Sequence, residues 1–456
     1  MNLPEQFLDS LEGCVGFSRS DFIQAHEQLA SVSIRVNPIK MVDGLRVQSE
    51  NFQTKIPWCD QGYYLSNRPK FTLDPLLHAG VYYVQEASSM FIHFILNQII
   101  PNERNLKVLD LCAAPGGKTT LLSSMPQIDF VLANEIISSR VSVLYENVVK
   151  WGSSKIFISN NDPDDFINVG EFFDIVLVDA PCSGSGLFRK DESAIDEWST
   201  EAVNFCSLRQ RRILQSAMQV LKPGGFLIYT TCSFSAVENE DNLDCLIDSN
   251  HFCKVEIEVP EDWGIVKSHS RRFGASGFRF YPDKLDGEGF FCGVLQKKDS
   301  SNTLFNKQMD EFHLSQKKYT YLKEWVNDEG VLFFTDKDAD YAIRDGHIEI
   351  RNYLKKYLRL RKSGIKIGSM MSKGFVPDHE LALSEHMSSA VKKIELNLSE
   401  ALKYLRKESL DKENLLDGLY LITYLDCGLG WGKVIGARIK NYYPMAWRIL
   451  MKNDPQ

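Results

Sequence analysis

The sequence predicts an α/β protein with a doubly wound parallel sheet, preceded by a small N-terminal α+β domain and followed by a C-terminal β-rich domain. Five apolar runs of strand length lie between residues 107 and 231, separated by helix-length amphipathic segments. This alternation is typical of βαβ units, whose parallel sheet is covered on both faces. The length of 456 residues and the 44% hydrophobic and 25% charged content fit a globular chain of about three domains.

The order of the predicted elements follows from local patterns. Helices are expected at 4–13 and 21–29, and a strand at 33–37, where polar and apolar residues alternate up to Pro38. Residues 81–100 are expected to form the edge of a strand and then a helix. The core strands are expected at 107–111, 130–135, 155–158, 173–179 and 226–231, and a late strand at 287–297 is expected to close the sheet. Residues 300–345 show no clear period, whereas short strands and Gly-rich turns after 346 predict a small barrel. The predicted domains are therefore 1–80, 81–298, 299–345 and 346–456.

Composition excludes several classes of protein. No run approaches the ~18–20 apolar residues of a membrane span, and the N-terminus has neither a basic start nor an apolar stretch, so neither a membrane segment nor a signal peptide is expected. The ten cysteines form no Cys-x-x-Cys pair and there is no His-Glu-x-x-His, so no metal site of standard spacing is predicted. Scattered cysteines without an export signal favour free thiols in the cytoplasm.

Charge is distributed unevenly along the chain. The net charge is −8, but residues 346–456 carry 19 basic and 12 acidic residues, a net of +7 against −15 for the rest. The densest stretch, 351–373, has eight basic residues and no acidic one. This asymmetry predicts a basic nucleic-acid-binding module on an acidic catalytic body, with a solvated basic helix face as the open alternative.

A loop of small residues follows the first core strand, at Cys112-Ala113-Ala114-Pro115-Gly116-Gly117-Lys118. Such a loop lets backbone N–H groups approach a ligand. A Walker P-loop would need glycine at position 112, and Gly-x-Gly-x-x-Gly is absent, so a di- or triphosphate is not predicted. Glu135, at the end of the second strand, is placed to accept hydrogen bonds from ribose hydroxyls. Asp162, after the third strand, is placed near an adenine. A nucleoside ligand without phosphates points to S-adenosylmethionine, although Glu135 as a helix-cap neighbour and Asp162 as a turn former remain open.

Two cysteines lie in polar loops after neighbouring core strands. Cys182 follows Asp179 at the end of the fourth strand, and Cys232 follows the fifth. A thiolate is a strong nucleophile, and its attack on carbon 6 of a pyrimidine makes carbon 5 able to accept a methyl group. Asp179 is the candidate to stabilise the ring at N3. The sequence therefore predicts methylation at carbon 5 of a pyrimidine base, with the choice of attacking thiol left open by spacing.

These segments resemble the signatures of the NSUN/Sun (RsmB/RsmF) RNA cytosine-C5 methyltransferases, from about residue 30 to 298. The matching motifs are Leu109-Asp110-Leu111-Cys112-Ala113-Ala114-Pro115-Gly116-Gly117-Lys118-Thr119, Asp179-Ala180-Pro181-Cys182-Ser183-Gly184, Thr231-Cys232-Ser233-Phe234, Arg189-Lys190-Asp191 and Gly287-Glu288-Gly289-Phe290-Phe291. The resemblance implies a Rossmann-like S-adenosylmethionine methyltransferase core. It implies Cys232 as the nucleophile, Cys182 as the release thiol, and Lys118 near the base. It also places residues 112–118 with Glu135, Asp162 and Asp179 around the cofactor.

The C-terminal part resembles the tail of RsmF-type bacterial enzymes, which act on small-subunit ribosomal RNA and end in a PUA-like domain. The matching segments are Gly364-Ile365-Lys366-Ile367-Gly368, Pro377-Asp378-His379-Glu380-Leu381-Ala382-Leu383-Ser384 and Gly430-Trp431-Gly432-Lys433. We expect a cytoplasmic, monomeric enzyme that methylates 16S ribosomal RNA. A transfer RNA enzyme of the same chemistry and a non-catalytic RNA-binding assembly factor are the alternatives. The expected RNA contacts are Arg189, Lys190, Lys355, Lys356, Arg359 and Arg361.

Overall fold

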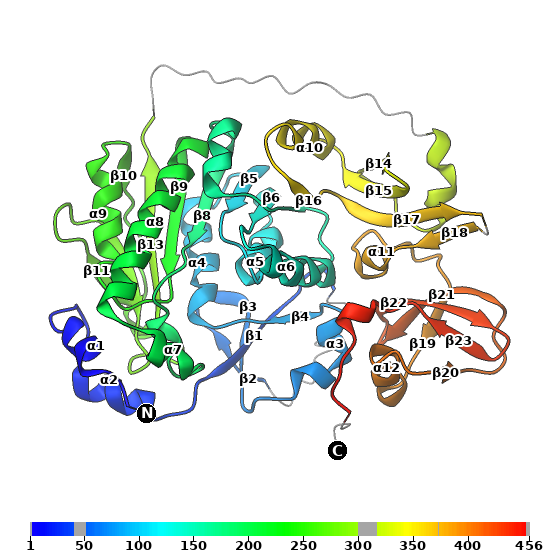
Figure 1. Ribbon diagram of the computed structural model, residues 1–456, viewed down its shortest axis with the longest axis horizontal. Helices are drawn as coiled ribbons and strands as arrows, with labels where there is room; N and C mark the ends of the chain where they lie inside the picture. Colours follow the sequence, from blue (N-terminus) through cyan, green and yellow to red (C-terminus); the bar gives the residue numbers. More distant parts are fainter. Residues whose placement is uncertain (1, 41–51, 300–316, 373, 453–456) are drawn as a thin grey trace.

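The computed structural model describes residues 2–40, 52–299, 317–372 and 374–452. A central sheet with helices on both faces forms the larger lobe, and a second lobe of small sheets lies beside it (Figure 1). Within the described residues, no helix is long and apolar enough to cross a membrane.

The central sheet has ten strands in the order β11-β12-β13-β9-β8-β5-β6-β7-β16, with β10 also paired to β13. Strands β5 to β9 are parallel, and the strands flanking them are antiparallel. The order places β6 on one side of β5 and β8 on the other, which is the doubly wound arrangement that the sequence predicts. The strands are β5 (Leu106–Asp110), β6 (Ile128–Asn134), β7 (Ile156–Ser159), β8 (Phe173–Asp179), β9 (Leu221–Thr231), β10 (Phe252–Lys254), β11 (Val266–His269), β12 (Ser276–Phe280), β13 (Phe290–Lys297) and β16 (Leu360–Lys362).

Side chains of the core strands alternate between two hydrophobic cores. Val108, for example, belongs to the core under one set of helices, and the next residue, Leu109, belongs to the core under the other. The first face is covered by α4 (Phe91–Ile99), α5 (Gly117–Ser124) and α6 (Ser138–Trp151). The second is covered by α8 (Thr200–Val220), α9 (Glu240–Asp248) and α10 (His347–Lys355). Burial on both faces explains why these strands read as continuous apolar runs.

The N-terminal part packs in two places. Helices α1 (Glu5–Ser10) and α2 (Arg19–His26) contribute Phe7 and Phe22 to a small aromatic core with Phe188 and Phe234. A four-stranded sheet of order β2-β3-β1-β4 lies next to the central domain. Its elements are β1 (Val32–Val36), β2 (Phe52–Ile56), β3 (Cys59–Leu65), η2 (Phe71–Leu73), α3 (Pro75–His78), β4 (Tyr82–Val84) and η3 (Ser88–Met90).

The C-terminal part contains two further sheets. The first has the order β14-β15-β17-β18 and the second the order β19-β21-β22-β23-β20. Their elements are η7 (Lys317–Glu324), β14 (Val331–Asp336), β15 (Ala339–Arg344), β17 (Ile365–Met371), β18 (Gly374–Pro377), α11 (His379–Leu383), β19 (Lys393–Glu395), α12 (Leu398–Leu405), β20 (Leu410–Asp411), β21 (Gly418–Tyr424), β22 (Cys427–Ile435), β23 (Arg438–Asn441) and η8 (Met445–Trp447). The remaining short helices are η4 (Pro163–Val169), η5 (Ser185–Leu187), α7 (Ser193–Glu197) and η6 (Glu261–Trp263).

The structure differs from the expected division of the chain near residue 346. The sheet β14-β15-β17-β18 runs across the predicted boundary between residues 345 and 346. After that boundary, α10 packs on the central sheet and β16 pairs with β7 at its edge. The basic composition of 351–373 obscured the apolar face of α10, on which Ile350, Tyr353 and Leu354 are buried.

The eight basic residues of 351–373 do not form one exposed patch. Arg351 pairs with Asp336, Lys362 pairs with Glu380, and both cations are largely buried. Lys366 pairs with Asp378. Lys355, Lys356, Arg359 and Arg361 are exposed, and Lys373 lies outside the described residues. Part of this charge therefore holds the fold together rather than facing solvent.

A substitution in α10 tests whether this helix packs on the central sheet. Leu354 is fully buried there, so Leu354→Ala should lower the free energy of unfolding by about 2–5 kcal/mol through lost burial and the cavity left behind. Chemical denaturation followed by tryptophan fluorescence measures it. The control is Leu416→Ala, at a side chain that is 73% exposed, which should change stability by about 0.5 kcal/mol or less. Equal effects of the two substitutions would contradict the packing of α10.

Candidate active site

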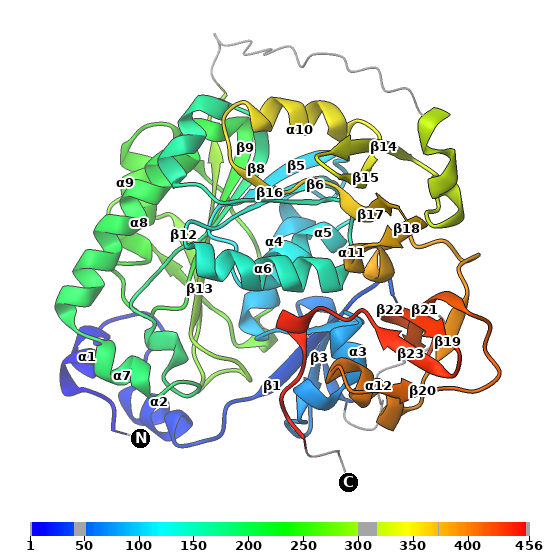
Figure 2. The ribbon, with the colours of Figure 1, turned by 45° about the vertical axis from the view of Figure 1, so that its right-hand side comes forward.

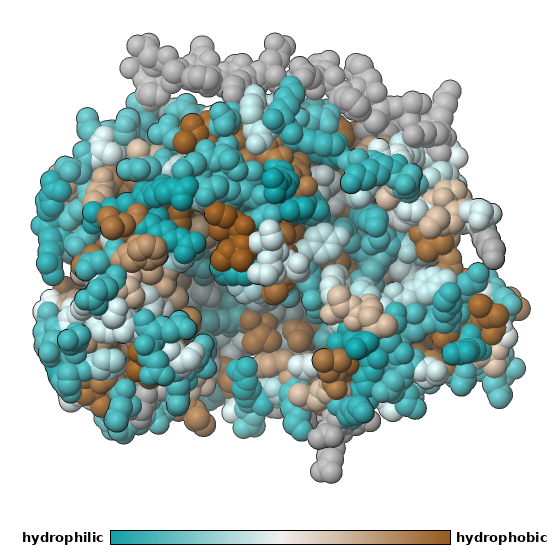
Figure 3. Space-filling view, in the orientation of Figure 1, coloured by the Kyte–Doolittle hydropathy of each residue, from teal (hydrophilic) through white to brown (hydrophobic). Residues whose placement is uncertain are grey.

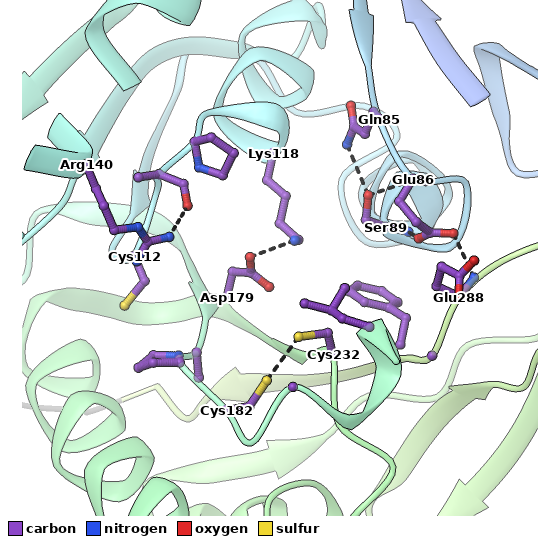
Figure 4. A pocket seen from close by; sticks show the side chains of 18 of the residues that line it. Gln85, Glu86, Ser89, Cys112, Lys118, Arg140, Asp179, Cys182, Cys232 and Glu288 are labelled. Atoms are coloured by element: carbon purple, nitrogen blue, oxygen red, sulfur yellow. Dashed lines mark hydrogen bonds and ion pairs between the residues drawn. The ribbon is translucent and has the colours of Figure 1, made fainter. Parts of the chain in front are cut away.

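The carboxyl ends of β5, β6, β8 and β9 open into a cavity of about 640 Å³. In parallel α/β sheets, ligands bind at this end of the strands, where the strand order reverses. Figure 3 shows the molecule hollowed near the centre of this face, and Figure 4 shows the side chains that line the cavity. The lining includes both predicted thiols, the small-residue loop and Glu135.

Two thiols meet at the floor of this cavity. Strands β8 and β9 pair in register, with Asp179 opposite Thr230, so the loops that follow them start side by side. The Cys182 Sγ and Cys232 Sγ atoms are 3.1 Å apart (Figure 4). The sheet register therefore brings together two cysteines that are 50 residues apart in the sequence.

A buried carboxylate holds the two thiol loops together. Glu238 has no exposed surface. Its carboxylate accepts hydrogen bonds from Ser183 N and Ser183 Oγ at 2.9 and 2.6 Å in one loop, and from Ser233 Oγ at 2.5 Å in the other. Gln210 of α8 donates a further hydrogen bond at 3.1 Å. Because Ser183 follows Cys182 and Ser233 follows Cys232, Glu238 fixes the separation of the two sulfur atoms.

The protonation of Cys182 differs from that of an exposed thiol. The hydrogen bond with Cys232, burial, and the nearby charge of Glu238 together raise the pKa of Cys182 well above its ordinary value. A thiol with a raised pKa keeps its proton and is a poor nucleophile. Cys182 is therefore a thiol that keeps its proton and can donate a hydrogen bond to Cys232.

A lysine and a carboxylate lie on the opposite wall. Lys118 Nζ is 2.7 Å from Asp179 Oδ2, and Thr230 Oγ1 donates to Asp179 Oδ1 at 2.8 Å. Burial lowers the pKa of Lys118, but the charge and hydrogen bond of Asp179 outweigh burial and raise it above the ordinary value. Lys118 is therefore a cation that faces the thiols across the cavity, 5.5 Å from the centre of the Phe290 ring.

The small-residue loop between β5 and α5 forms another wall of the site. Cys112, Ala114 and Pro115 line the cavity. Gly116 has a φ of +112°, and a Cβ on Gly117 would approach Tyr83 to 3.3 Å, so both positions favour glycine. Ala113 and Gly117 line an adjoining cavity of about 170 Å³.

Two carboxylates, one in this cavity and one in the adjoining cavity, offer acceptors to a nucleoside ligand such as S-adenosylmethionine. Glu135 lies at the end of β6, where its Oε1 accepts a hydrogen bond from Ile137 N and its Oε2 is 3.3 Å from Arg140 Nη1. Asp110 is buried at the end of β5; burial raises its pKa to about 7, and its Oδ1 has no hydrogen-bond partner within the described part of the chain. An N–H group of a bound ligand would satisfy such an oxygen.

Asp162 has a different environment from the one expected at an adenine. Its carboxylate accepts hydrogen bonds from Asp164 N at 3.0 Å and from Arg212 Nη2 at 2.5 Å, so it caps η4 and forms an ion pair. The next residue, Pro163, lines the cavity, as does Arg212. The structure therefore places the segment after β7 at the cavity, but the Asp162 carboxylate binds Arg212.

Arg189 is not available as an RNA contact, which corrects the sequence-based expectation. Its side chain is 5% exposed and forms an ion pair with Glu288, 3.0 Å between Nη2 and Oε1. It also donates to the Gly287 carbonyl. The basic pair at 189–190 therefore has two roles, because Lys190 lines the cavity while Arg189 anchors the loop before β13.

Several residues of the site carry no recognisable sequence signal. Glu238 lies in an acidic segment that resembles an exposed helix start, and its burial depends on donors from three separate segments. Arg140 bridges Glu135 and the Ala114 carbonyl, and it lies on a helix whose periodicity indicates only amphipathic packing. Glu86 accepts hydrogen bonds from Ser89 N and Glu288 N and lines the cavity.

The fold and this site define an S-adenosylmethionine-dependent methyltransferase, and comparison with known proteins gives the family. Residues 97–296 match the model of the 16S rRNA methyltransferase RsmB/F family, 3–87 match the N-terminal domain of 16S rRNA methyltransferase RsmF, and 391–449 match the methyltransferase RsmF PUA domain. The chain is 32% identical to "Ribosomal RNA small subunit methyltransferase F" of Vibrio cholerae and 31% identical to that of Vibrio vulnificus, with 97% of each chain covered. The chain therefore belongs to the RsmB/F family of 16S rRNA methyltransferases.

A solved structure supports the fold of the core. A methyltransferase homolog protein from Pyrococcus horikoshii is 27% identical, with a TM-score of 0.50, and the match covers 65% of this chain and all of that one. The predicted fold class is thus confirmed, with an N-terminal domain, a Rossmann-like core and a C-terminal PUA domain. The match to the PUA domain begins at 391, so residues 346–390 precede it.

Removing the Glu135 carboxylate tests the cofactor site. Glu135→Ala should weaken S-adenosylmethionine binding about 10- to 150-fold, as expected for a lost charge-assisted hydrogen bond. Isothermal titration calorimetry measures the affinity. Glu146→Ala, which removes a carboxylate from α6 outside the cavity, is the matched control and should bind normally. An unchanged affinity in the Glu135 variant would refute the ribose role.

A second substitution tests the carboxylate beneath the thiols. Glu238→Ala leaves buried donors of Ser183, Ser233 and Gln210 without an acceptor, so the free energy of unfolding should fall by about 1–3 kcal/mol. Methyl transfer should fall as well because the thiol loops are no longer held together, while cofactor affinity should stay near wild type. The control is Glu258→Ala, at a side chain that is 92% exposed. Full methyl transfer by the Glu238 variant would show that the sulfur spacing does not depend on this residue.

Proposed function

We propose that this protein methylates carbon 5 of a cytosine in 16S ribosomal RNA through a covalent bond between Cys232 and carbon 6. The observation that carries the proposal is the pair of thiols 3.1 Å apart on the floor of the cofactor cavity. Membership of the RsmB/F family supports RNA of the small subunit as the substrate. The action would take place in the cytoplasm, on RNA, by a monomer.

Cys232 is the proposed nucleophile. Its thiolate attacks carbon 6 of the cytosine, and the electron pair of the carbon 5–carbon 6 double bond moves so that carbon 5 becomes nucleophilic. Asp179 is proposed to hold a proton at N3 of the ring, which neutralises the negative charge that builds up when the thiolate attacks, and Lys118 Nζ lies 2.7 Å from Asp179 Oδ2. When bound, S-adenosylmethionine supplies an electrophilic methyl group, which carbon 5 accepts. Residues 112–118, Glu135, Asp162 and Asp179 would hold it.

Cys182 is the proposed release thiol. After methylation, a water molecule in the cavity accepts the proton of carbon 5, and the electron pair of that C–H bond restores the carbon 5–carbon 6 double bond. The carbon 6–sulfur bond breaks, and its electron pair leaves with Cys232 as a thiolate. Cys182 keeps its proton because its pKa is raised, and its sulfur lies 3.1 Å from that of Cys232. A hydrogen bond donated by the Cys182 thiol stabilises the departing Cys232 thiolate and so favours release.

Exposed cations are the proposed RNA contacts. Lys190 lines the cavity, and Lys355, Lys356, Arg359 and Arg361 are exposed between the end of α10 and β16. Arg359 and Arg361 also join the edge of the core, since the Arg359 N–H donates to Asn161 Oδ1 and Arg361 Nη2 donates to Asn160 Oδ1. Both cations therefore lie next to the segment after β7.

The two cysteines should separate by chemistry. Cys232→Ala should abolish both methyl transfer and covalent attachment to RNA because the nucleophile is gone. Cys182→Ala should still attack but release slowly, so a protein–RNA adduct should accumulate. Denaturing gels with labelled 16S rRNA and cofactor measure the adduct, and Cys206→Ala, a third cysteine outside the cavity, is the control. An adduct in the Cys232 variant but none in the Cys182 variant would reverse the two roles.

A further inference from the structure

A second cavity, of about 1070 Å³, lies between the methyltransferase core and the C-terminal lobe. Helix α6 and Arg361 of β16 form one side of it, and Lys407, Lys440, Tyr442 and Trp447 form the other. We call it the interdomain groove. Helices α6 and α11, which border it, lie side by side in both ribbon views (Figures 1 and 2).

The charge of the interdomain groove is positive. Arg361, Lys407 and Lys440 line it, and none of the three forms an ion pair with a carboxylate within the described ranges. Its two acidic residues are already neutralised, because Asp378 pairs with Lys366 at 2.8 Å and Glu380 pairs with Lys362 at 3.2 Å. The three cations are therefore left to attract a polyanion.

Two aromatic rings lie beside these cations. Tyr442 and Trp447 line the groove and are partly exposed. The Lys440 ammonium lies 5.6 Å from the centre of the Tyr442 ring. The Trp447 ring packs edge-on against His379, whose pKa is lowered to about 3 by burial and nearby lysines, so this histidine is a neutral support. Aromatic faces next to cations are the features that bind single-stranded nucleic acid by stacking.

The groove and the active-site cavity meet at the start of α6. Ile136 and Arg140 line the active-site cavity, while Ser138 and Val141, between and beside them, line the groove. Asn160 connects the two as well, because it lines the groove and donates to the Glu135 carbonyl at 2.8 Å. A turn of helix advances about 5.4 Å, so a strand whose base enters the cavity reaches the groove within a few nucleotides.

The far side of the groove is held in a fixed position. Leu76 and Tyr82 of the N-terminal part share one buried core with Tyr404 and Ile422 of the C-terminal lobe. In addition, Tyr145 of α6 donates a hydrogen bond to Glu380 of α11. These contacts fix the two sides of the groove relative to each other. They also fix the distance between the active-site cavity and the groove.

We propose that the interdomain groove binds a single-stranded segment of the substrate RNA that flanks the target nucleotide. Bases stack on Trp447 and Tyr442, and phosphates contact Lys440, Lys407 and Arg361. This inference rests on the proposed function and deepens it, because it assigns the RNA that flanks the target nucleotide to the interdomain groove.

Charge reversal at one groove lysine tests this proposal. Lys440→Glu should weaken binding of a 16S rRNA transcript about tenfold or more and reduce the slope of log affinity against log salt by about 1, because one phosphate contact is lost. The matched control is Lys254→Glu, an exposed lysine of β10 outside both cavities, at the other side of the central sheet. Filter binding at three salt concentrations measures affinity, and calorimetry should show unchanged cofactor binding.

Substitution of the tryptophan supplies an independent test. Trp447→Ala should weaken RNA binding about tenfold, whereas Trp447→Phe, which keeps a ring for stacking, should restore most of it. Both variants are compared by thermal melting, so that a loss caused by unfolding is recognised. In methylation assays the KM for RNA should rise and kcat at saturating RNA should stay close to wild type.

The outcomes separate the groove from the proposed chemistry. Wild-type RNA affinity and salt slope in the Lys440 and Trp447 variants would overturn the groove while leaving the methylation proposal standing. If the Lys440 and Trp447 variants bound protein-free 16S rRNA as the wild type does but no longer bound intact small subunits, the proposal would also be overturned. The occupant of the groove would then be a ribosomal protein. Absence of cytosine methylation by the wild-type protein would instead refute the proposed function.

Discussion

The active site depends on the parallel register of β8 and β9. Because Asp179 pairs with Thr230, the loops carrying Cys182 and Cys232 leave the sheet at the same level, and Glu238 ties the serines next to the two thiols to one buried carboxylate. A shift of the register would separate the sulfur atoms and also remove the Thr230 hydrogen bond that orients Asp179. The alternating packing of these strands into two cores maintains the register.

The rest of the molecule surrounds this floor and controls what reaches it. The small-residue loop and Glu135 form the side of the cavity proposed to bind the cofactor, and the aromatic core of Phe7, Phe22 and Phe234 packs beside the segment after Cys232. The C-terminal lobe is joined to the N-terminal part by a shared core. The proposed RNA-binding surface and the thiol pair therefore lie on one packed framework, and the basic C-terminal part is not an independent tail.

Sequence reasoning captured what is local and missed what depends on contacts between distant segments. Short apolar runs predicted the core strands, and the residue types after them pointed to the small-residue loop, Glu135 and the two thiols, which the structure places around one cavity. It did not anticipate that α10 and β16 complete the methyltransferase domain, since eight cations concealed the buried face of Ile350, Tyr353 and Leu354. Arg189 and Glu238 were likewise out of reach, because an ion pair or hydrogen bond with residues about 50 to 100 positions away leaves no periodic signal.

The central claim is that this protein makes 5-methylcytidine in 16S ribosomal RNA. The most direct measurement is bisulfite sequencing, with nucleoside mass spectrometry, of 16S rRNA from cells that carry the gene and from cells that lack it. We expect a cytosine that resists conversion in the first RNA and converts in the second, with a matching loss of 5-methylcytidine. An identical 5-methylcytidine content in both RNAs, or loss of a ribose or exocyclic-amine methyl group instead, would contradict it.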